Sequence, residues 1–194
     1  MIALPNYADI NGRPMKKLQI QQYLRKLQLN DFEPAVNLAT LTKLQDAHLK
    51  YIPYENFDCL NGKITSLKRQ DMFNKVIMHN RGGICFELNG LYNWLLESLG
   101  FDVTSYSARF IDKMETYQLR RHRVMCVALG DKRYLTDVGV NSESPRVPLE
   151  ITECLIQSDG ISQYKFTRSE FWGWLLWQKE RGKIWKRLFG FTEE

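Results

Sequence analysis

Residues 81–90 read Arg81-Gly82-Gly83-Ile84-Cys85-Phe86-Glu87-Leu88-Asn89-Gly90. Two glycines precede the cysteine, and the apolar residues after it recur at helical spacing until Gly100, a residue that typically ends a helix. This pattern predicts a helix over residues 85–99 with Cys85 in its first turn. The N–H groups and dipole of a helix N-terminus favour a thiolate over a thiol, so the stretch is typical of a nucleophilic cysteine. A lone cysteine, however, more often packs as a small apolar residue.

Two downstream residues have the chemistry that a nucleophilic cysteine needs. His122 lies at the start of one β-rich run, and Asp137 follows a second run that is joined to the first by Gly130-Asp131-Lys132. A hairpin of this kind would place His122 and Asp137 side by side near its open end. Because a thiol needs a base to take its proton, and the base needs a partner that fixes its tautomer, the three residues form a candidate Cys–His–Asp triad.

These motifs resemble those of the arylamine N-acetyltransferases. The stretch 81–89, the downstream histidine and the Asp137-Val138-Gly139 run fit the family pattern, and Ile52-Pro53-Tyr54-Glu55-Asn56-Phe57 resembles a second family motif. The resemblance extends from about residue 15 to the end of the chain and implies that Cys85 accepts an acetyl group, His122 is its base and Asp137 orients the base. His79 is a rival base by proximity in the sequence, and the family match favours His122.

The resemblance also implies a substrate site and a mechanism. Acetyl-CoA would be the acyl donor, and an arylamine or arylhydrazine would be the acceptor, in a ping-pong reaction through acetyl-Cys85. Tyr54, Phe86 and Val140 are the residues expected to bind the acceptor. The backbone N–H of Cys85 is the expected first donor to an oxyanion. No metal is expected.

Glu55 lies between aromatic residues, where a carboxylate needs a partner. We hypothesise an ion pair between Arg81 and Glu55 that holds the cysteine loop in place. Two departures from the family bear on function. The chain ends where the family's β-barrel ends, so we expect the C-terminal α/β lid to be absent. Val140 stands where the family commonly has phenylalanine, which leaves selectivity for aromatic amines open.

The fold class expected is α+β. Helical spacing predicts a bundle in residues 1–99, with helices near 14–28, 35–48 and 68–79 before the cysteine helix, and His48 at the surface or a boundary. After Gly100 the alternation changes to a period of two, and residues 100–194 are expected to form an antiparallel β-barrel that carries His122 and Asp137. Short strands are expected near 148–157 and 161–168, a loop or lid over 111–120, and a hairpin in the tryptophan-rich tail from Phe171 to Phe191, where a basic amphipathic helix is the alternative.

Composition limits the partners. The chain has 194 residues, 44% hydrophobic and 25% charged, with a net charge of +5. The basic residues are dispersed and no nucleic-acid motif is present, so we expect no nucleic-acid partner. The four cysteines form no CxxC pair, which argues against zinc. No apolar run is long enough to span a membrane, and we expect a cytoplasmic protein with Cys85 reduced.

Two other interpretations remain open. One is a thiol hydrolase or transglutaminase-like enzyme, because Cys–His–Asp in this order also serves amide chemistry. The other is a family member that has little or no activity without its lid, and that associates with copies of itself through exposed apolar surface.

Overall fold

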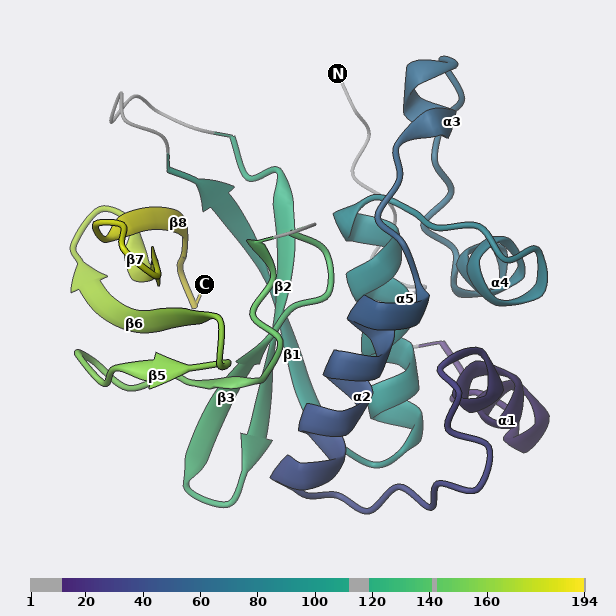
Figure 1. Cartoon of the computed structure of the whole chain (residues 1–194). Coiled ribbons are helices and arrows are strands. Elements are labelled where there is room, and N and C mark those ends of the chain that lie inside the picture. Colours follow the sequence, from purple (N-terminus) through teal and green to yellow (C-terminus); the bar gives the residue numbers. More distant parts are fainter. Residues whose placement is uncertain (1–11, 112–118, 141–142, 194) are drawn as a thin grey trace.

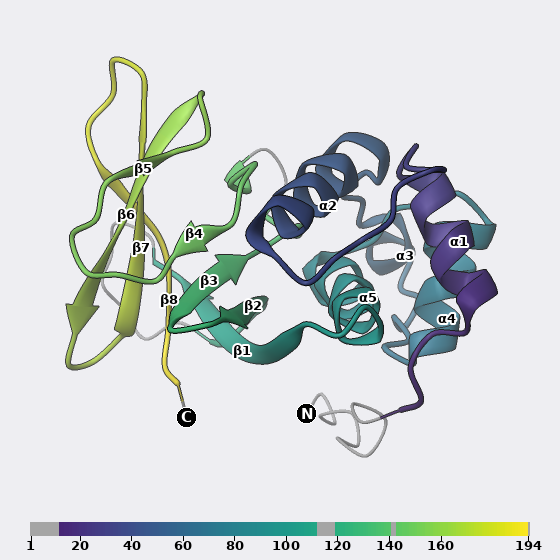
Figure 2. The same ribbon diagram turned by 90° about the horizontal axis from the view of Figure 1, so that it is seen from below.

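The computed structural model describes residues 12–111, 119–140 and 143–193. The helices are α1 (Lys17–Lys26), α2 (Leu38–Tyr51), α3 (Phe57–Leu60), α4 (Arg69–Phe73), the π-helical turn η2 (Asn74–Met78) and α5 (Cys85–Ser98). The strands are β1 (Asp102–Phe110), β2 (His122–Leu129), β3 (Lys132–Thr136), β4 (Leu149–Glu150), β5 (Gln157–Ser158), β6 (Ser162–Ser169), β7 (Gly173–Glu180) and β8 (Lys186–Phe191). Figures 1 and 2 show the helices gathered on one side of the molecule and a curled sheet on the other.

The eight strands form one antiparallel sheet in the order β4-β3-β2-β1-β8-β7-β6-β5. β1 joins its two halves, since Ala108 pairs with His122 on one side and with Phe191 on the other. The outer strands β4 and β5 are tied together by Gln157, whose side chain bonds the backbone N–H and carbonyl of Glu150 at 2.7 and 2.9 Å. The sheet is therefore a nearly closed barrel, which confirms the predicted fold class.

The cysteine helix is the element that connects the two parts of the fold. α5 ends at Ser98, and Gly100 has a φ of +92°, as expected for a glycine that ends a helix. Leu88, Leu91 and Leu95 of α5 share an apolar core with Met125 and Val127 of β2. A second apolar core fills the barrel. Because the first core crosses the helix–strand boundary, the division into domains at residues 99 and 100 stays a prediction.

The position predicted for His48 is wrong. This side chain is fully buried, its Nδ1 lies 3.0 Å from the Tyr23 hydroxyl, and its ring meets the edge of Tyr92 at a centroid distance of 5.3 Å. Leu41 and Leu44 precede it at helical spacing, so the turn of α2 brings all three residues to the same core. Burial lowers the pKa of His48 to about 3, which keeps the imidazole neutral.

The other predicted elements have mixed outcomes. The third helix forms as α4 followed by η2, and the short strands expected near 148–157 and 161–168 are β4, β5 and β6. The first of these regions is interrupted at Cys154, which has a φ of +60° and donates its N–H to the carbonyl of Phe166. The tail is the β7–β8 hairpin, as predicted, with Gly182 in its turn. Most of the expected lid, residues 112–118, lies outside the described residues.

Candidate active site

Cys85 is the first residue of α5 and is buried, with 8% of the residue exposed. The loop before it runs against the 52–57 motif, where Tyr54 and Gly83 form a parallel β-bridge. A Cβ at position 82 would lie 2.0 Å from the carbonyl oxygen of Pro53, so only glycine permits this close approach. The sequence motif thus places the thiol at the N-terminus of a helix, on a loop held by a distant segment.

His122 and Asp137 meet at the open end of the β2–β3 hairpin, as predicted. Nε2 of His122 lies 2.7 Å from Oδ2 of Asp137, and both side chains are fully buried. The other carboxylate oxygen, Oδ1, accepts a hydrogen bond of 2.8 Å from the Gly139 N–H. A Cβ on Gly139 would lie 2.8 Å from Cα of Cys85, so this glycine lets the end of the hairpin pack against the cysteine.

The surroundings of His122 favour its charged form. Burial by itself lowers the pKa of this imidazole, but the charge and hydrogen bond of Asp137, together with the Cys85 thiol, raise it to about 9. Nδ1 has no hydrogen-bond partner within the described ranges, which leaves it open to a proton from the reacting groups. The Cys85 Sγ lies 3.6 Å from the carbonyl oxygen of Arg121. Because an acidic partner raises the proton affinity of an imidazole, the arrangement favours the protonated form of His122.

Asn89 connects the cysteine helix to the strand ends that carry His122 and Asp137, and the sequence interpretation gave it no role. Its Nδ2 donates to Oδ1 of Asp137 at 2.8 Å and to the carbonyl of Arg123 at 2.5 Å, while its Oδ1 accepts from the Val138 N–H at 2.8 Å. The side chain is fully buried. Asn89 lies one helical turn after Cys85, and this spacing was the signal that both side chains share one face of α5.

Two aromatic rings fix the imidazole from the barrel side. Phe110 of β1 and Phe189 of β8 lie 5.0 and 5.2 Å from the His122 ring, centroid to centroid. Neither was predicted, because β1 and β8 become neighbours only when the sheet closes. These rings exclude water from one side of the base and restrict its rotation.

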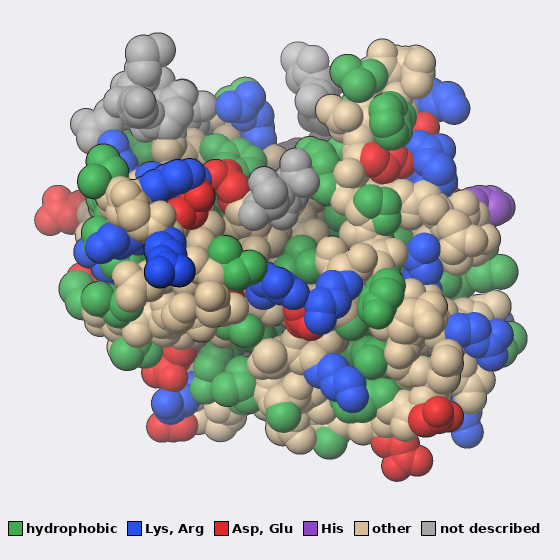
Figure 3. Space-filling model, in the orientation of Figure 1, with side chains coloured by type: hydrophobic (Ala, Val, Ile, Leu, Met, Phe, Trp, Pro, Cys, Tyr) green, Lys and Arg blue, Asp and Glu red, His purple; other side chains and the backbone are tan. Residues whose placement is uncertain are grey.

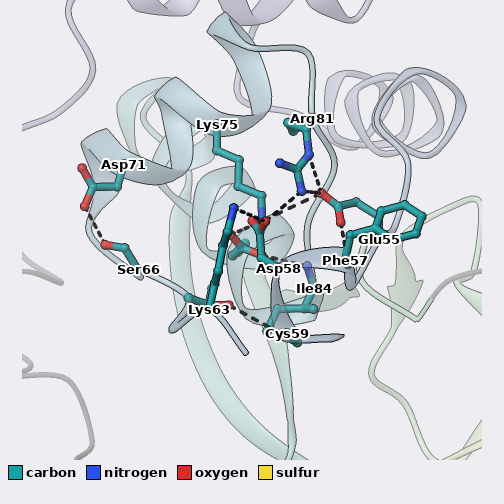
Figure 4. A network of polar contacts seen from close by, with 12 residues as sticks. Glu55, Phe57, Asp58, Cys59, Lys63, Ser66, Asp71, Lys75, Arg81 and Ile84 are labelled. Carbon is teal, nitrogen blue, oxygen red and sulfur yellow. Dashed lines mark hydrogen bonds and ion pairs between the residues drawn. The ribbon is translucent and has the colours of Figure 1, made fainter. Parts of the chain in front are cut away.

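The predicted ion pair between Arg81 and Glu55 is present. Nε and Nη2 of Arg81 lie 3.0 and 2.7 Å from Oε1 of Glu55. Nη2 also lies 3.1 Å from Asp58, and Lys75 reaches Asp58 and Glu87 at 2.8 Å each. Figure 4 shows Arg81, Glu55, Asp58 and Lys75 meeting near Ile84 of the cysteine loop. The contact is confirmed, while its effect on activity stays a prediction.

The three expected acceptor-binding residues have different surroundings. Tyr54 is 38% exposed, and its phenol pKa is raised by burial and by the nearby thiols of Cys85 and Cys59. Phe86 is half-buried on α5. Val140 is buried in the barrel core, with its N–H bonded to the Ser144 hydroxyl at 2.8 Å. Tyr54 is therefore the most exposed of the three and pairs with Gly83 of the cysteine loop, and the contribution of each residue to acceptor binding stays a prediction.

The structure gives less support to the other candidate sites. His79 is exposed and directly follows η2, whereas the side chains of His122 and Asp137 are fully buried. Within residues 12–111, 119–140 and 143–193, no group of three or more metal-ligating side chains gathers, and none of the helices there is long and apolar enough to cross a bilayer. On the face shown in Figure 3, basic side chains are spread over both parts of the fold and interspersed with acidic ones.

Comparison with known proteins gives the family. A profile described as N-acetyltransferase matches residues 37–194. The chain belongs to the arylamine N-acetyltransferase family. The arylamine N-acetyltransferase of Mycolicibacterium smegmatis is 35% identical over 178 residues, which are 89% of this chain and 64% of that protein. Proansamycin X synthase of Amycolatopsis mediterranei is 30% identical, over 93% of this chain and 70% of its own length.

The fold agrees with solved structures of this family. The arylamine N-acetyltransferase of Salmonella typhimurium superposes with a TM-score of 0.86 at 26% identity, covering 93% of this chain and 65% of that one. The Mycolicibacterium smegmatis enzyme gives a TM-score of 0.84 at 33% identity. The chain thus spans about two thirds of the length of these arylamine N-acetyltransferases.

Proposed function

We propose that this chain transfers an acetyl group from acetyl-CoA to an arylamine or arylhydrazine through an acetyl-Cys85 intermediate. The observation that carries the proposal is the fully buried His122–Asp137 pair, 2.7 Å apart, next to a cysteine at the N-terminus of α5. The family assignment supports the acetyl donor and the aromatic acceptor. We place the reaction in the cytoplasm, where a reducing environment keeps the thiol free.

The first half of the reaction forms the acyl-enzyme. The Cys85 thiolate attacks the thioester carbonyl, a new carbon–sulfur bond forms, and the negative charge on oxygen is held by backbone N–H groups, of which that of Cys85 is the first. The bond to the coenzyme sulfur then breaks, and the leaving thiolate takes a proton from the His122 imidazolium. One thioester replaces another, so the acyl-enzyme forms without a large difference in energy.

The second half transfers the acetyl group. The acceptor nitrogen attacks acetyl-Cys85, His122 takes a proton from that nitrogen, and the Cys85 thiolate leaves. Asp137 keeps the ring oriented and stabilises its charged form in both steps. In this proposal Tyr54 contacts an aromatic acceptor, which is supported by its exposure and by its β-bridge to Gly83 of the cysteine loop.

A second candidate is transfer of a different acyl group by the same thiol. It is favoured by the match to a relative named proansamycin X synthase, a name that does not specify acetylation. The thiol hydrolase interpretation and an inactive family member also keep the same site but give no acetyl adduct that an arylamine can discharge.

Intact-protein mass spectrometry after mixing with acetyl-CoA tests the proposal, with Cys85→Ala as the control. We expect an acetyl adduct on the wild-type chain that the control lacks and that an added arylamine removes. A folded chain that acquires no adduct would refute acetyl transfer. If such a chain is still alkylated at Cys85 at neutral pH, the second candidate becomes the better explanation.

A further inference from the structure

Lys75 brings a positive charge beneath the cysteine loop, and no sequence motif identified it. Its Nζ lies 2.8 and 3.1 Å from the two carboxylate oxygens of Glu87, 2.8 Å from Asp58 and 3.9 Å from Glu55. Its side chain is only 17% exposed. Figure 4 shows Lys75 beside Asp58, next to Arg81 and Glu55. The carboxylates that Lys75 contacts at 2.8 Å come from α3 and from α5.

The π-helical turn η2 delivers Lys75 to this position. Such turns are rare in proteins, and they occur often at functional sites because they redirect a side chain. The wider turn is closed by the bond from the His79 N–H to the Asn74 carbonyl at 2.9 Å. The Lys75 carbonyl accepts the Arg81 N–H at 3.1 Å, so both the backbone and the side chain of Lys75 hold the cysteine loop.

Glu87 explains why the positive charge is needed. Its side chain is 3% exposed, it lies two residues after Cys85, and its Oε2 accepts the Ile84 N–H at 3.0 Å. This bond caps the first turn of α5, and it holds a buried negative charge in the same helical turn as Cys85. A nearby carboxylate disfavours a thiolate unless a cation offsets it. Lys75 contacts both oxygens of that carboxylate.

We propose that Lys75 is a positioning residue that keeps the Cys85 thiolate available at neutral pH by offsetting the charge of Glu87. The proposal rests on the proposed function in taking Cys85 as the nucleophile. Lys75 does not touch the reacting atoms, and it acts through Glu87 and the loop that ends at Ile84. The sequence places it ten residues before Cys85, and after the π-helical turn its ammonium group contacts Glu87 in the first turn of the helix that Cys85 begins.

Other ionisable groups also face this site and are unchanged by the test below. His122 from β2 and Tyr54 from the segment before α3 lie beside the thiol, and Asp137 acts through His122. Around Lys75, Glu55 and Asp58 are also bound by Arg81. Arg123 of β2 approaches α5 at Gly90.

The pH dependence of Cys85 alkylation by iodoacetamide, followed on the Cys85 peptide by mass spectrometry, tests the proposal. Lys75→Met should raise the midpoint by about one pH unit and slow alkylation about tenfold at neutral pH. Glu87→Gln keeps the bond to the Ile84 N–H and should lower the midpoint. The double variant should return it close to the wild-type value, because both charges are then removed.

Lys63→Met is the matched control. This lysine also approaches Asp58, at 3.9 Å, but its side chain is 69% exposed and its removal should leave the midpoint unchanged. The proposal is wrong if folded Lys75→Met has the wild-type midpoint of alkylation. It is also wrong if the midpoint of the double variant equals that of Lys75→Met. If Lys75→Met does not fold, an unchanged midpoint in Glu87→Gln overturns the proposal. A wild-type midpoint near that of free cysteine would instead refute the thiolate in the proposed function.

Discussion

The His122–Asp137 pair should make the protein lose stability as the pH rises above neutral, and Asp137→Asn should abolish that loss. The substitution keeps the shape of the side chain, and its amide oxygen can still accept from Asn89 and Gly139. It removes the negative charge that outweighs burial in setting the pKa of His122. Its amide nitrogen can donate to a neutral imidazole.

The magnitude follows from the pKa of His122, which is raised from 6.5 to about 9 in the folded chain. A group with a raised pKa stabilises the fold fully below the unfolded pKa, and this contribution is lost as the pH rises through the folded value. Each pH unit in this interval is worth about 1.4 kcal/mol, so the wild-type chain should lose about 3 kcal/mol of its free energy of unfolding between about pH 6 and pH 9. In Asp137→Asn burial still lowers the pKa of His122, and this loss should disappear.

Urea unfolding followed by tryptophan fluorescence measures the effect, with both proteins examined at about pH 6 and about pH 9. The quantity to compare is the difference in the free energy of unfolding between the wild type and Asp137→Asn, because the other titrating groups contribute equally to both proteins. We expect this difference to decrease by about 3 kcal/mol between about pH 6 and about pH 9. Parallel pH dependences in the two proteins would refute the assignment of a charged His122 in the resting fold.

Three further outcomes are expected. His48, with its pKa lowered to about 3, should make the chain lose about 5 kcal/mol as the pH falls from 6.5 toward 3, and His48→Gln should flatten this dependence in the same urea assay. Asn89→Ala should cost about 3 kcal/mol of stability and lower kcat/KM about a hundredfold, because Asp137 loses a buried donor; Asn89→Asp should not restore the rate. Gly82→Ala should lower the free energy of unfolding by more than about 2 kcal/mol, since the new Cβ would meet the Pro53 carbonyl; a melting temperature equal to that of the wild type would contradict the described loop.

Local patterns in the sequence were enough to predict the elements that carry the triad. The helical spacing after Cys85 and Gly100 gave the extent of α5, and the hairpin around Gly130 placed His122 near Asp137. Such signals are local: a helix repeats every few residues, and a short turn fixes the register of its two strands. The Arg81–Glu55 contact was predicted because a carboxylate between aromatic residues needs a partner, and one cation lay in the neighbouring motif.

Most other contacts between segments distant in the sequence were not predicted. The burial of His48 depends on Tyr23 and Tyr92, which reach it from other helices. Phe110 and Phe189 meet His122 only because β1 pairs with both β2 and β8. No periodicity within one segment specifies which other segment will lie against it.

The sequence by itself determined which residues are the candidate nucleophile, base and acid, and it predicted helices before Gly100 and strands after it. Each of these predictions rests on spacing within a short run of residues. Only the tertiary structure decided how the triad is supported. Asn89 bonds the end of the β2–β3 hairpin, and the π-helical turn brings Lys75 to Glu87. The physical reason is that buried polar groups need partners, and close packing supplies those partners from whichever segments the fold brings together.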